Sequence, residues 1–371
     1  MFTRSTCIRT NVRSHPQIWI FVSNQPCVRK TSLMSTFTPL KSDKTNRDTD
    51  ASNASRTSTA KPSKPQYRLA EDVEDLHRYC PGGYHPLELG DDLNKGRYRL
   101  VDKLGYGGYS SIWLARDLHR ARYVAVKVIT ADASTSTPEA SLLSSLGNSP
   151  LGLGSEIIPR LLDEFWIAGP NGKHRCIVTP PARMSLFDAK EASTFGLFHL
   201  DVARSITARL IRGVAVLHGQ DIVHGDLHLG NILVQYPREG IDALSTAELY
   251  EKYGEPYSEA VIRLDSKPLA NNIPARVFIP SWYGLRSNDI ILGEEKILLS
   301  DFGESFNPHE TARFSSKTLP LLQPPEARFS NEPLSFPSDV WTLACTIWEI
   351  LGQGLYLRPF SLLLTVSLPS K

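Results

Sequence analysis

A glycine-rich turn between two strand-like segments places the strongest constraint on how this chain can fold. Residues 98–104 are β-prone, the turn 104–112 contains three glycines, and strand-like sequence resumes at 111–115. A third apolar segment, 123–129, carries Lys127 near its end. Strands joined by such short turns pair antiparallel. The sequence therefore predicts an antiparallel meander and not a dinucleotide-binding βαβ unit, in which a helix would follow the glycines.

Composition narrows the class of protein. The chain has 371 residues, which is room for one two-lobed domain with tails or for two ordinary domains. Its net charge of +2 lacks the basic excess of a nucleic-acid binder. Its five cysteines form no CxxC pair, and no apolar run reaches the ~18 residues of a membrane-spanning helix. We expect an intracellular monomer that binds neither nucleic acid nor membrane.

The first 66 residues are predicted to be an extension without a fold of its own. Residues 1–42 contain Arg, Lys, Ser and Thr but no Asp or Glu, which is typical of a mitochondrial transit peptide. A disordered tail, or a true start at Met34, are the alternatives. Residues 35–66 are rich in Ser, Thr, Asn, Lys and Asp and read as a disordered linker. The expected location is therefore the cytoplasm and nucleus, or the mitochondrion.

Order is expected to begin near Tyr67 and to form two lobes. A short helix should begin at Thr137 or Pro138, and a hairpin should occupy 157–179. Residues 200–218 have apolar side chains on one helical face. We therefore predict an α+β bilobal fold. Its N-lobe, residues 98–182, should hold five antiparallel strands and one helix, and a helical C-lobe should follow from 183 to 371.

The glycine turn and Lys127 together suggest a phosphate-binding site. Backbone N–H groups in a turn without bulky side chains can approach phosphate oxygens, although glycine-rich hairpins are common for structural reasons. Lys127 would add a charge for the α- and β-phosphates, and Glu139 at the start of the next helix would hold it. Taken singly, these residues could be a surface lysine and an acid stabilising a helix dipole. Their order favours the functional interpretation.

Two further segments contain residues suited to catalysis and to metal binding. Asp226 and Asn231 stand five residues apart in a loop between a helix and a strand. An Asp there can orient a substrate hydroxyl, and an Asn amide oxygen can bind Mg²⁺. Asp301, followed by Phe302 and Gly303, supplies a second carboxylate at a strand end, suited to the metal that bridges the phosphates.

In this order the motifs resemble the eukaryotic protein kinase family. Pro324–Glu326 stands where that family has Ala-Pro-Glu, and Asp339 stands where a buried helix braces the catalytic-loop backbone. The resemblance covers roughly residues 98–352. It implies the protein-kinase fold, Mg²⁺ and ATP, and transfer of the γ-phosphoryl group to Ser or Thr hydroxyls.

The resemblance also implies where ATP and the metal would bind. ATP should lie between the lobes, contacting the backbone around residues 179–182, where Pro180 and Pro181 offer no N–H donor. Asn231 and Asp301 would hold the metal. The residues implied in catalysis are Lys127, Glu139, Asp226, His228, Asn231 and Asp301. Those implied in nucleotide binding are Leu104, Gly105, Tyr106, Gly107, Gly108, Tyr109, Ser110, Ser111, Ile112, Ala125 and Lys127, with Ile112 and Ala125 against the adenine.

Two other segments resemble a narrower group, the kinases specific for Ser/Arg-rich splicing factors, especially the fungal members. The first is the lead-in segment, residues 67–97, with its Tyr-Cys-Pro-Gly-Gly-Tyr-His-Pro stretch at 79–86. The second is the insert, residues 236–295, between the catalytic loop and Asp-Phe-Gly, which is far longer than a hairpin requires. The resemblance implies protein substrates, Arg/Ser-rich splicing factors among them.

Three departures from the family pattern surround Asp226. Gly225 replaces the Arg that clamps a phosphorylated activation loop, so activity should not depend on that phosphorylation. His228 replaces a Lys beside the γ-phosphate and removes a fixed positive charge. Leu229 and Gly230 replace Pro-Glu and remove an acid that helps to read basic peptides.

The stretch His-Gly-Asp-Leu-His also resembles small-molecule kinases that act on aminoglycosides or choline. That substrate class is the first alternative, against which stand Asp-Phe-Gly and the Asp339 helix. A catalytically inactive nucleotide-binding module is the second. It is suggested because the family's C-lobe continues well beyond Gly352 and supplies an Arg to Glu326, so we expect an incomplete lobe, an unpaired buried Glu326 and an uncovered apolar core. The apolar run 362–368 would be exposed or would cover that core.

Overall fold

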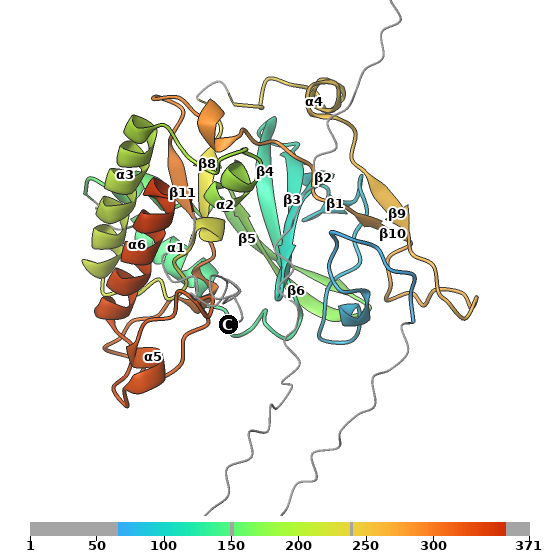
Figure 1. Ribbon diagram of the computed structural model, residues 1–371. Helices are drawn as coiled ribbons and strands as arrows, with labels where there is room; N and C mark the ends of the chain where they lie inside the picture. The colour runs from blue at the N-terminus through green and yellow to red at the C-terminus, as the bar shows by residue number, and fades with distance from the viewer. Residues whose placement is uncertain (1–65, 149–151, 238–239, 354–371) are drawn as a thin grey trace, which may run out of the picture.

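The computed structural model describes residues 66–148, 152–237 and 240–353 (Figure 1). The predictions of a transit peptide and of a disordered linker concern residues up to 65, which lie outside these ranges. The apolar run 362–368 lies outside them too. Within the described residues, no helix is long and apolar enough to cross a bilayer.

The N-lobe is built on one antiparallel sheet with the strand order β1-β2-β3-β4-β6-β5. Its strands are β1 (Asp92–Leu93), β2 (Tyr98–Gly107), β3 (Ser110–Asp117), β4 (Arg122–Ile129), β5 (Asp163–Gly169) and β6 (Gly172–Thr179). The prediction of five strands was wrong by one. The added strand β1 pairs with Tyr98 and Arg99 over only two residues, too few to show the period-two pattern of a strand in the sequence.

The two faces of this sheet bury different cores. Trp113, Val126 and Val178 point to one face and pack with Phe278 of the insert. The other face carries Ile177 toward α1 (Glu139–Asn148), whose Ala140, Leu143 and Leu146 are buried. Helix α1 begins directly after Pro138, as predicted, because Pro is favoured at a helix start and an acid stabilises the first turn.

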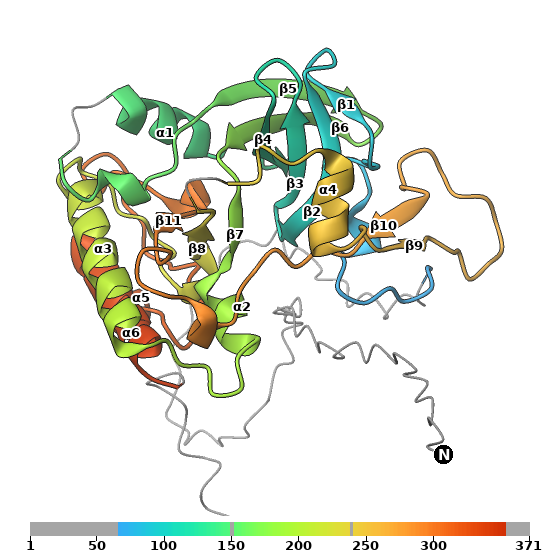
Figure 2. The same cartoon turned by 90° about the horizontal axis from the view of Figure 1, so that it is seen from above.

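The C-lobe combines a small sheet with helices (Figures 1 and 2). The sheet has the antiparallel order β11-β8-β7. Its strands are β7 (Ala182–Ser185), β8 (Ile232–Gln235) and β11 (Ile297–Leu299). The α-helices are α2 (Leu186–Glu191), α3 (Leu200–His218), α5 (Glu326–Phe329) and α6 (Phe336–Leu351). Helix α3 has the bounds predicted from its apolar face, and α6 packs beside it.

Single 3-10 turns connect many of these elements. They are η1 (Leu76–Arg78), η2 (Ser155–Ile157), η3 (Leu229–Asn231), η4 (Ser287–Asp289) and η5 (Phe302–Glu304). The hairpin expected from residue 157 begins later, at β5, because η2 occupies the position. Ile157 of η2 is buried against Gly213 of α3, where a Cβ would lie 2.0 Å from the Ile157 side chain.

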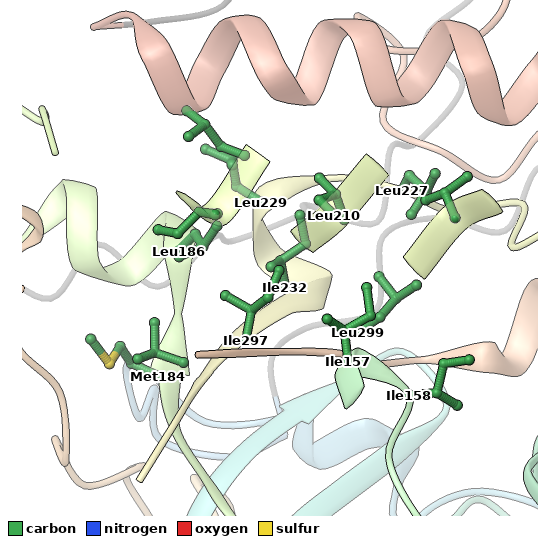
Figure 3. Packing of buried hydrophobic residues seen from close by; sticks show 14 of the residues in the cluster. Ile157, Ile158, Met184, Leu186, Leu210, Leu227, Leu229, Ile232, Ile297 and Leu299 are labelled. Carbon is green, nitrogen blue, oxygen red and sulfur yellow. The ribbon is translucent and has the colours of Figure 1, made fainter. Parts of the chain in front are cut away.

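The C-lobe core lies between the small sheet and the helices. Figure 3 shows Ile232 and Ile297 from the sheet converging with Leu210 of α3 and Ile157 of η2. These side chains are fully buried. They anchor both ends of the loop that runs from α3 to β8, and this loop contains Asp226.

The insert folds onto the N-lobe sheet instead of forming an open polar loop. It contains α4 (Thr246–Tyr253), which a Ser245–Glu248 capping box begins, and the hairpin β9 (Ser258–Ala260) with β10 (Arg276–Phe278). Figure 2 shows these elements beside β1, β2 and β3. Tyr250 of α4 donates a 2.6 Å hydrogen bond to the carbonyl oxygen of Val101 in β2.

Two expectations concern the end of the kinase-like region: an uncovered apolar core and a buried, unpaired Glu326. Helix α6 exposes several large apolar side chains, including Val340 (54%), Trp341 (36%) and Leu351 (48%), so an apolar face is open to solvent among the described residues. Glu326 is half-buried, so the expectation of a fully buried acid at this position was wrong. Its place in the first turn of the four-residue helix α5 keeps it near the surface.

Candidate active site

The glycine-rich turn lies at the end of the β2–β3 hairpin. Gly107 and Ser110 are the last cross-strand pair, which leaves Gly108 and Tyr109 at the tip. A Cβ added to Gly105 or Gly107 would meet no atom of the described protein within 4 Å. The fold itself therefore leaves open space beside these backbone atoms, and this is the space that phosphate oxygens would need.

Lys127 lies between two carboxylates in the space below this turn. Its Nζ is 2.6 Å from Oε2 of Glu139 and 2.8 Å from Oδ1 of Asp301. Burial alone would lower the pKa of Lys127, but Asp301 and Glu139 raise it above its ordinary value. Lys127 in turn lowers the pKa of Asp301. The three side chains come from β4, α1 and the segment after β11, and they form one charged cluster.

Helix α1 is also joined directly to the Asp-Phe-Gly segment. Helix α1 packs against η5. Burial raises the pKa of Glu139, and the Lys127 ammonium and the backbone of Phe302 oppose that shift. Asp301 itself has a left-handed backbone, with φ 61°, which is uncommon outside glycine and is found at functional sites.

The catalytic loop presents Asp226 with one oxygen unused. Asn231 Nδ2 donates to the carbonyl oxygen of Asp226 at 2.9 Å and to its Oδ2 at 3.2 Å. Asp226 Oδ1 is buried and has no hydrogen-bond partner among the described residues. Ser300 donates its backbone N–H to the carbonyl oxygen of Asn231 at 2.8 Å, which places Asn231 beside Asp301 in the chain fold.

Asp339 of α6 braces the backbone before Asp226, as predicted. Its two carboxylate oxygens accept from the backbone N–H groups of His224 (2.7 Å) and Gly225 (2.9 Å). Its Oδ2 lies 3.1 Å from His218 Nε2. Buried N–H groups need such partners, so α6 fixes the shape of the loop.

His224 connects the same loop to the Asp-Phe-Gly segment. Its Nδ1 accepts from the backbone N–H of Asp226, and its Nε2 lies 3.1 Å from the carbonyl oxygen of Ser300. These partners require the neutral tautomer with the proton on Nε2. Burial lowers the pKa of His224, which favours that neutral form. The ring also packs edge-on against Phe302, with the centroids 5.0 Å apart.

Two of the three departures from the family pattern, Gly225 and His228, make contacts close to Asp226. Gly225 has φ +80°, and a Cβ there would lie 2.6 Å from the carbonyl oxygen of Glu304. The chain therefore passes too close for the family's Arg in this conformation. His228 turns toward Asp226, with Nε2 3.6 Å from Oδ2, while its Nδ1 accepts from the N–H of Gly230.

The activation segment, from Asp301 to Glu326, makes two contacts that were not predicted from the sequence. Thr318 Oγ1 donates to the carbonyl oxygen of Gly225 at 3.1 Å. Arg313 Nη1 donates to the carbonyl oxygen (2.8 Å) and to Oε2 (3.0 Å) of Glu304. The only sequence signal for them was their position between Asp-Phe-Gly and Pro-Pro-Glu. The Thr318 bond holds the segment against the catalytic loop, and the Arg313 contacts fold the segment back onto Glu304.

The hinge between the lobes, where the adenine is predicted to bind, follows β6. Ala125 pairs with Thr179 at the end of β6, and Ala125 is buried while Ile112 is partly exposed. Pro180 and Pro181 follow Thr179 and are partly exposed. Contact of an adenine with Ile112 and Ala125 stays a prediction.

The comparisons with known proteins agree with this geometry. Residues 98–242 match the protein kinase domain family. Over these residues the chain is similar to protein kinase domains. A crystal structure of a kinase domain superposes with a TM-score of 0.52 over 73% of this chain and 69% of that one, and its 19% identity speaks for the fold alone. The similarity to this solved structure confirms the predicted α+β bilobal fold.

Curated proteins that are similar to this chain include SRSF protein kinase 3 of Homo sapiens, 37% identical over 169 residues, or 44% of this chain and 30% of the relative. The serine/threonine-protein kinase spk-1 of Caenorhabditis elegans is 32% identical, over 47% of this chain and 18% of its own length. SKY1 of Saccharomyces cerevisiae is 31% identical, over 44% and 23%. The predicted resemblance to this narrower group is confirmed. The chain spans less than a third of the length of these three relatives.

Proposed function

We propose that this chain is an ATP-dependent serine/threonine protein kinase. One observation carries the proposal. Lys127 contacts both Glu139 (2.6 Å) and Asp301 (2.8 Å), beneath a glycine turn with open space beside its backbone. A charged lysine held in this way matches the phosphate-contacting lysine of kinases. The buried Oδ1 of Asp226, which has no hydrogen-bond partner in the described part of the chain, supplies the group that a substrate hydroxyl would need.

Protein kinases use ATP with Mg²⁺, and the residues present fit both. Asp301 offers a carboxylate and Asn231 an amide oxygen, which are ligand types that Mg²⁺ prefers. The described residues contain no group of three or more His, Cys, Asp or Glu side chains arranged around a metal, so phosphate oxygens and water would complete the coordination. Bound Mg²⁺ would neutralise charge on the phosphates.

The chain's own residues have separate tasks in the proposed transfer. Asp226 Oδ1 would accept a hydrogen bond from the attacking Ser or Thr hydroxyl and orient its oxygen in line with the γ-phosphorus. Lys127 would hold the α- and β-phosphates, and Glu139 would hold Lys127. The new bond joins the hydroxyl oxygen to the γ-phosphorus, and the bond between that phosphorus and the β-phosphate oxygen breaks, so that ADP leaves. The hydroxyl proton passes to the Asp226 carboxylate and then to solvent. Positioning and charge stabilisation would provide most of the acceleration.

The proposed substrates are proteins rich in Arg and Ser. The support is the likeness to proteins named SRSF protein kinases, together with the lead-in segment and the insert. Acting on splicing factors would place the protein in the cytoplasm and nucleus, and we propose that it works as a monomer.

The experiment is a transfer assay with γ-labelled ATP, Mg²⁺ and the full chain. The acceptors are an Arg-Ser repeat peptide, a matched Arg-Ala peptide, kanamycin and choline. The proposal expects label on the Arg-Ser peptide alone, and none with Asp226→Asn. Label on kanamycin or choline instead would establish the small-molecule class. Nucleotide binding with no labelled acceptor would indicate an inactive nucleotide-binding module.

A further inference from the structure

The lead-in segment, drawn in blue in Figure 1, packs with the insert and lies against the glycine-rich turn. Its buried side chains Tyr67, Leu76, Tyr79 and Tyr84 share a cluster with Val261 and Val277 of the insert. None of the proposed catalytic steps uses this segment. Its contacts nevertheless end on the backbone that would hold the phosphates.

Tyr84 makes the direct contact with the turn. Its hydroxyl donates a 2.6 Å hydrogen bond to the carbonyl oxygen of Gly107, the last residue of β2 before the tip. Tyr84 is only 3% exposed, and burial raises its pKa to about 12 although Arg78 opposes this, so the hydroxyl keeps its proton at neutral pH. The guanidinium of Arg78 lies 4.9 Å from the Tyr84 ring and 5.8 Å from that of Tyr109 at the tip.

A tight turn in the lead-in segment directs Tyr84 toward this position. A Cβ on Gly83 would lie 1.7 Å from the carbonyl oxygen of Arg78, so only glycine allows the reversal. The carbonyl oxygens of Gly82 and Gly83 accept from the N–H groups of Asp132 (2.9 Å) and Ala131 (3.1 Å), which follow β4. The support for Tyr84 is therefore fixed to the N-lobe, and this explains the Gly-Gly pair in the sequence.

Strand β2 is held a second time just before the turn. Lys103 Nζ is paired with Glu74 of the lead-in segment, and both side chains are almost completely buried. The adjacent Asp102 accepts from the hydroxyl groups of Tyr283 and Ser281 in the insert. The β2–β3 register shifts on both sides of Lys103, so pairing with β3 is irregular where these outside contacts act.

We propose that the lead-in segment holds the glycine-rich turn in the conformation that receives nucleotide phosphates, with Tyr84 as the positioning residue. This inference rests on the proposed kinase function. A hairpin tip fixed only by its partner strand has access to other conformations. The apparent affinity for a phosphate ligand falls in proportion to the population of the competent one. The hydrogen bond from Tyr84 raises that population.

The test compares Tyr84→Phe with the wild-type full chain. Binding of a non-hydrolysable ATP analogue with Mg²⁺, and of adenosine alone, is measured by titration calorimetry. Tyr84→Phe should bind the triphosphate about three- to tenfold more weakly, the size expected for one hydrogen bond. Adenosine affinity should stay unchanged, because the turn contacts phosphates. Tyr250→Phe is the matched control, since Tyr250 donates at the same 2.6 Å to Val101 of the same strand, upstream of the turn.

Each other outcome overturns the inference in a recognisable way. Equal triphosphate affinity in Tyr84→Phe and wild type would show that the contact does not set the turn. Equal losses for triphosphate and adenosine, or the same loss in Tyr250→Phe, would show a general loss of structure, which melting curves of both variants would register. A wild-type chain that binds neither ligand would overturn the proposed function itself and the inference with it.

Discussion

The Nζ of Lys127 lies 2.8 Å from Oδ1 of Asp301, a residue 174 positions later in the chain. The contact joins a strand of the N-lobe to the segment after β11 in the C-lobe. The two lobes therefore meet through opposite charges at the point where the phosphates would lie.

Lys127→Met should remove phosphoryl transfer, with a loss of at least about 100-fold, because a preorganised charge is lost while the side-chain stem remains. Asp301→Ala should have the same effect through the metal. Initial rates with the Arg-Ser peptide measure both. Lys252→Met, which alters a lysine on the insert helix α4, is the control and should keep the wild-type rate. Full activity in Lys127→Met or in Asp301→Ala would refute the assignment of that residue.

Asp339→Asn should lower stability by about 1–3 kcal/mol, because one of the two backbone N–H groups that it binds loses its charged acceptor inside the protein. Urea unfolding measures the change. Asp201→Asn is the control, because Asp201 is exposed on α3 and lies 3.7 Å from the exposed Arg204. An unchanged midpoint for Asp339→Asn would mean that α6 does not brace the catalytic loop.

The buried pair Lys103–Glu74 should behave differently from the exposed pair Arg99–Asp92. Glu74→Gln leaves a buried ammonium without its partner and should cost about 3–5 kcal/mol. The double variant Glu74→Gln with Lys103→Met should recover much of that loss. Asp92→Asn, in a pair whose side chains are 52% and 38% exposed, should cost at most about 1 kcal/mol. A double-mutant cycle by urea unfolding gives the coupling, and a value near zero would contradict the burial of the pair.

Gly225→Ala should destabilise the chain by about 1–3 kcal/mol, since it places a Cβ 2.6 Å from the Glu304 carbonyl oxygen at a positive φ.

The same glycine leaves no Arg to bind a phosphorylated activation segment. Phosphatase-treated and untreated wild-type protein should therefore transfer phosphate at the same rate. A large fall after treatment would show that another cation reads such a phosphate.

Stability should fall in mild acid partly through His85. Burial, with His174 nearby, lowers the pKa of His85 from 6.5 to about 4. The unfolded chain then binds a proton that the folded chain does not, so stability is complete above pH 6.5 and falls as the pH drops toward 4. The contribution is about 2–3 kcal/mol. Urea unfolding at pH 7 and pH 4.5 should show a smaller acid loss in His85→Phe. An equal loss would assign the effect to other groups.

The sequence by itself determined two of the helices and the order in which the candidate site residues follow one another. The apolar stripe of 200–218 gave helix α3 to the residue, and Pro138 placed Glu139 in the first turn of α1. These are local signals, since caps and periodicity depend on neighbours within about one turn. The motif order indicated which Asp and Lys residues belong to one site.

Only the tertiary structure decided how those residues are held. The pairing of Lys127 with Asp301 and the contact of Tyr84 with Gly107 join residues far apart in sequence. The packing of the loop also decided that Oδ1 of Asp226 has no partner among the described residues. The same holds for the insert, whose polar sequence gave no sign that Phe278 would pack on Trp113. Such contacts depend on how whole elements pack, because a side chain's partner across a sheet or between lobes leaves no periodic signal in the local sequence.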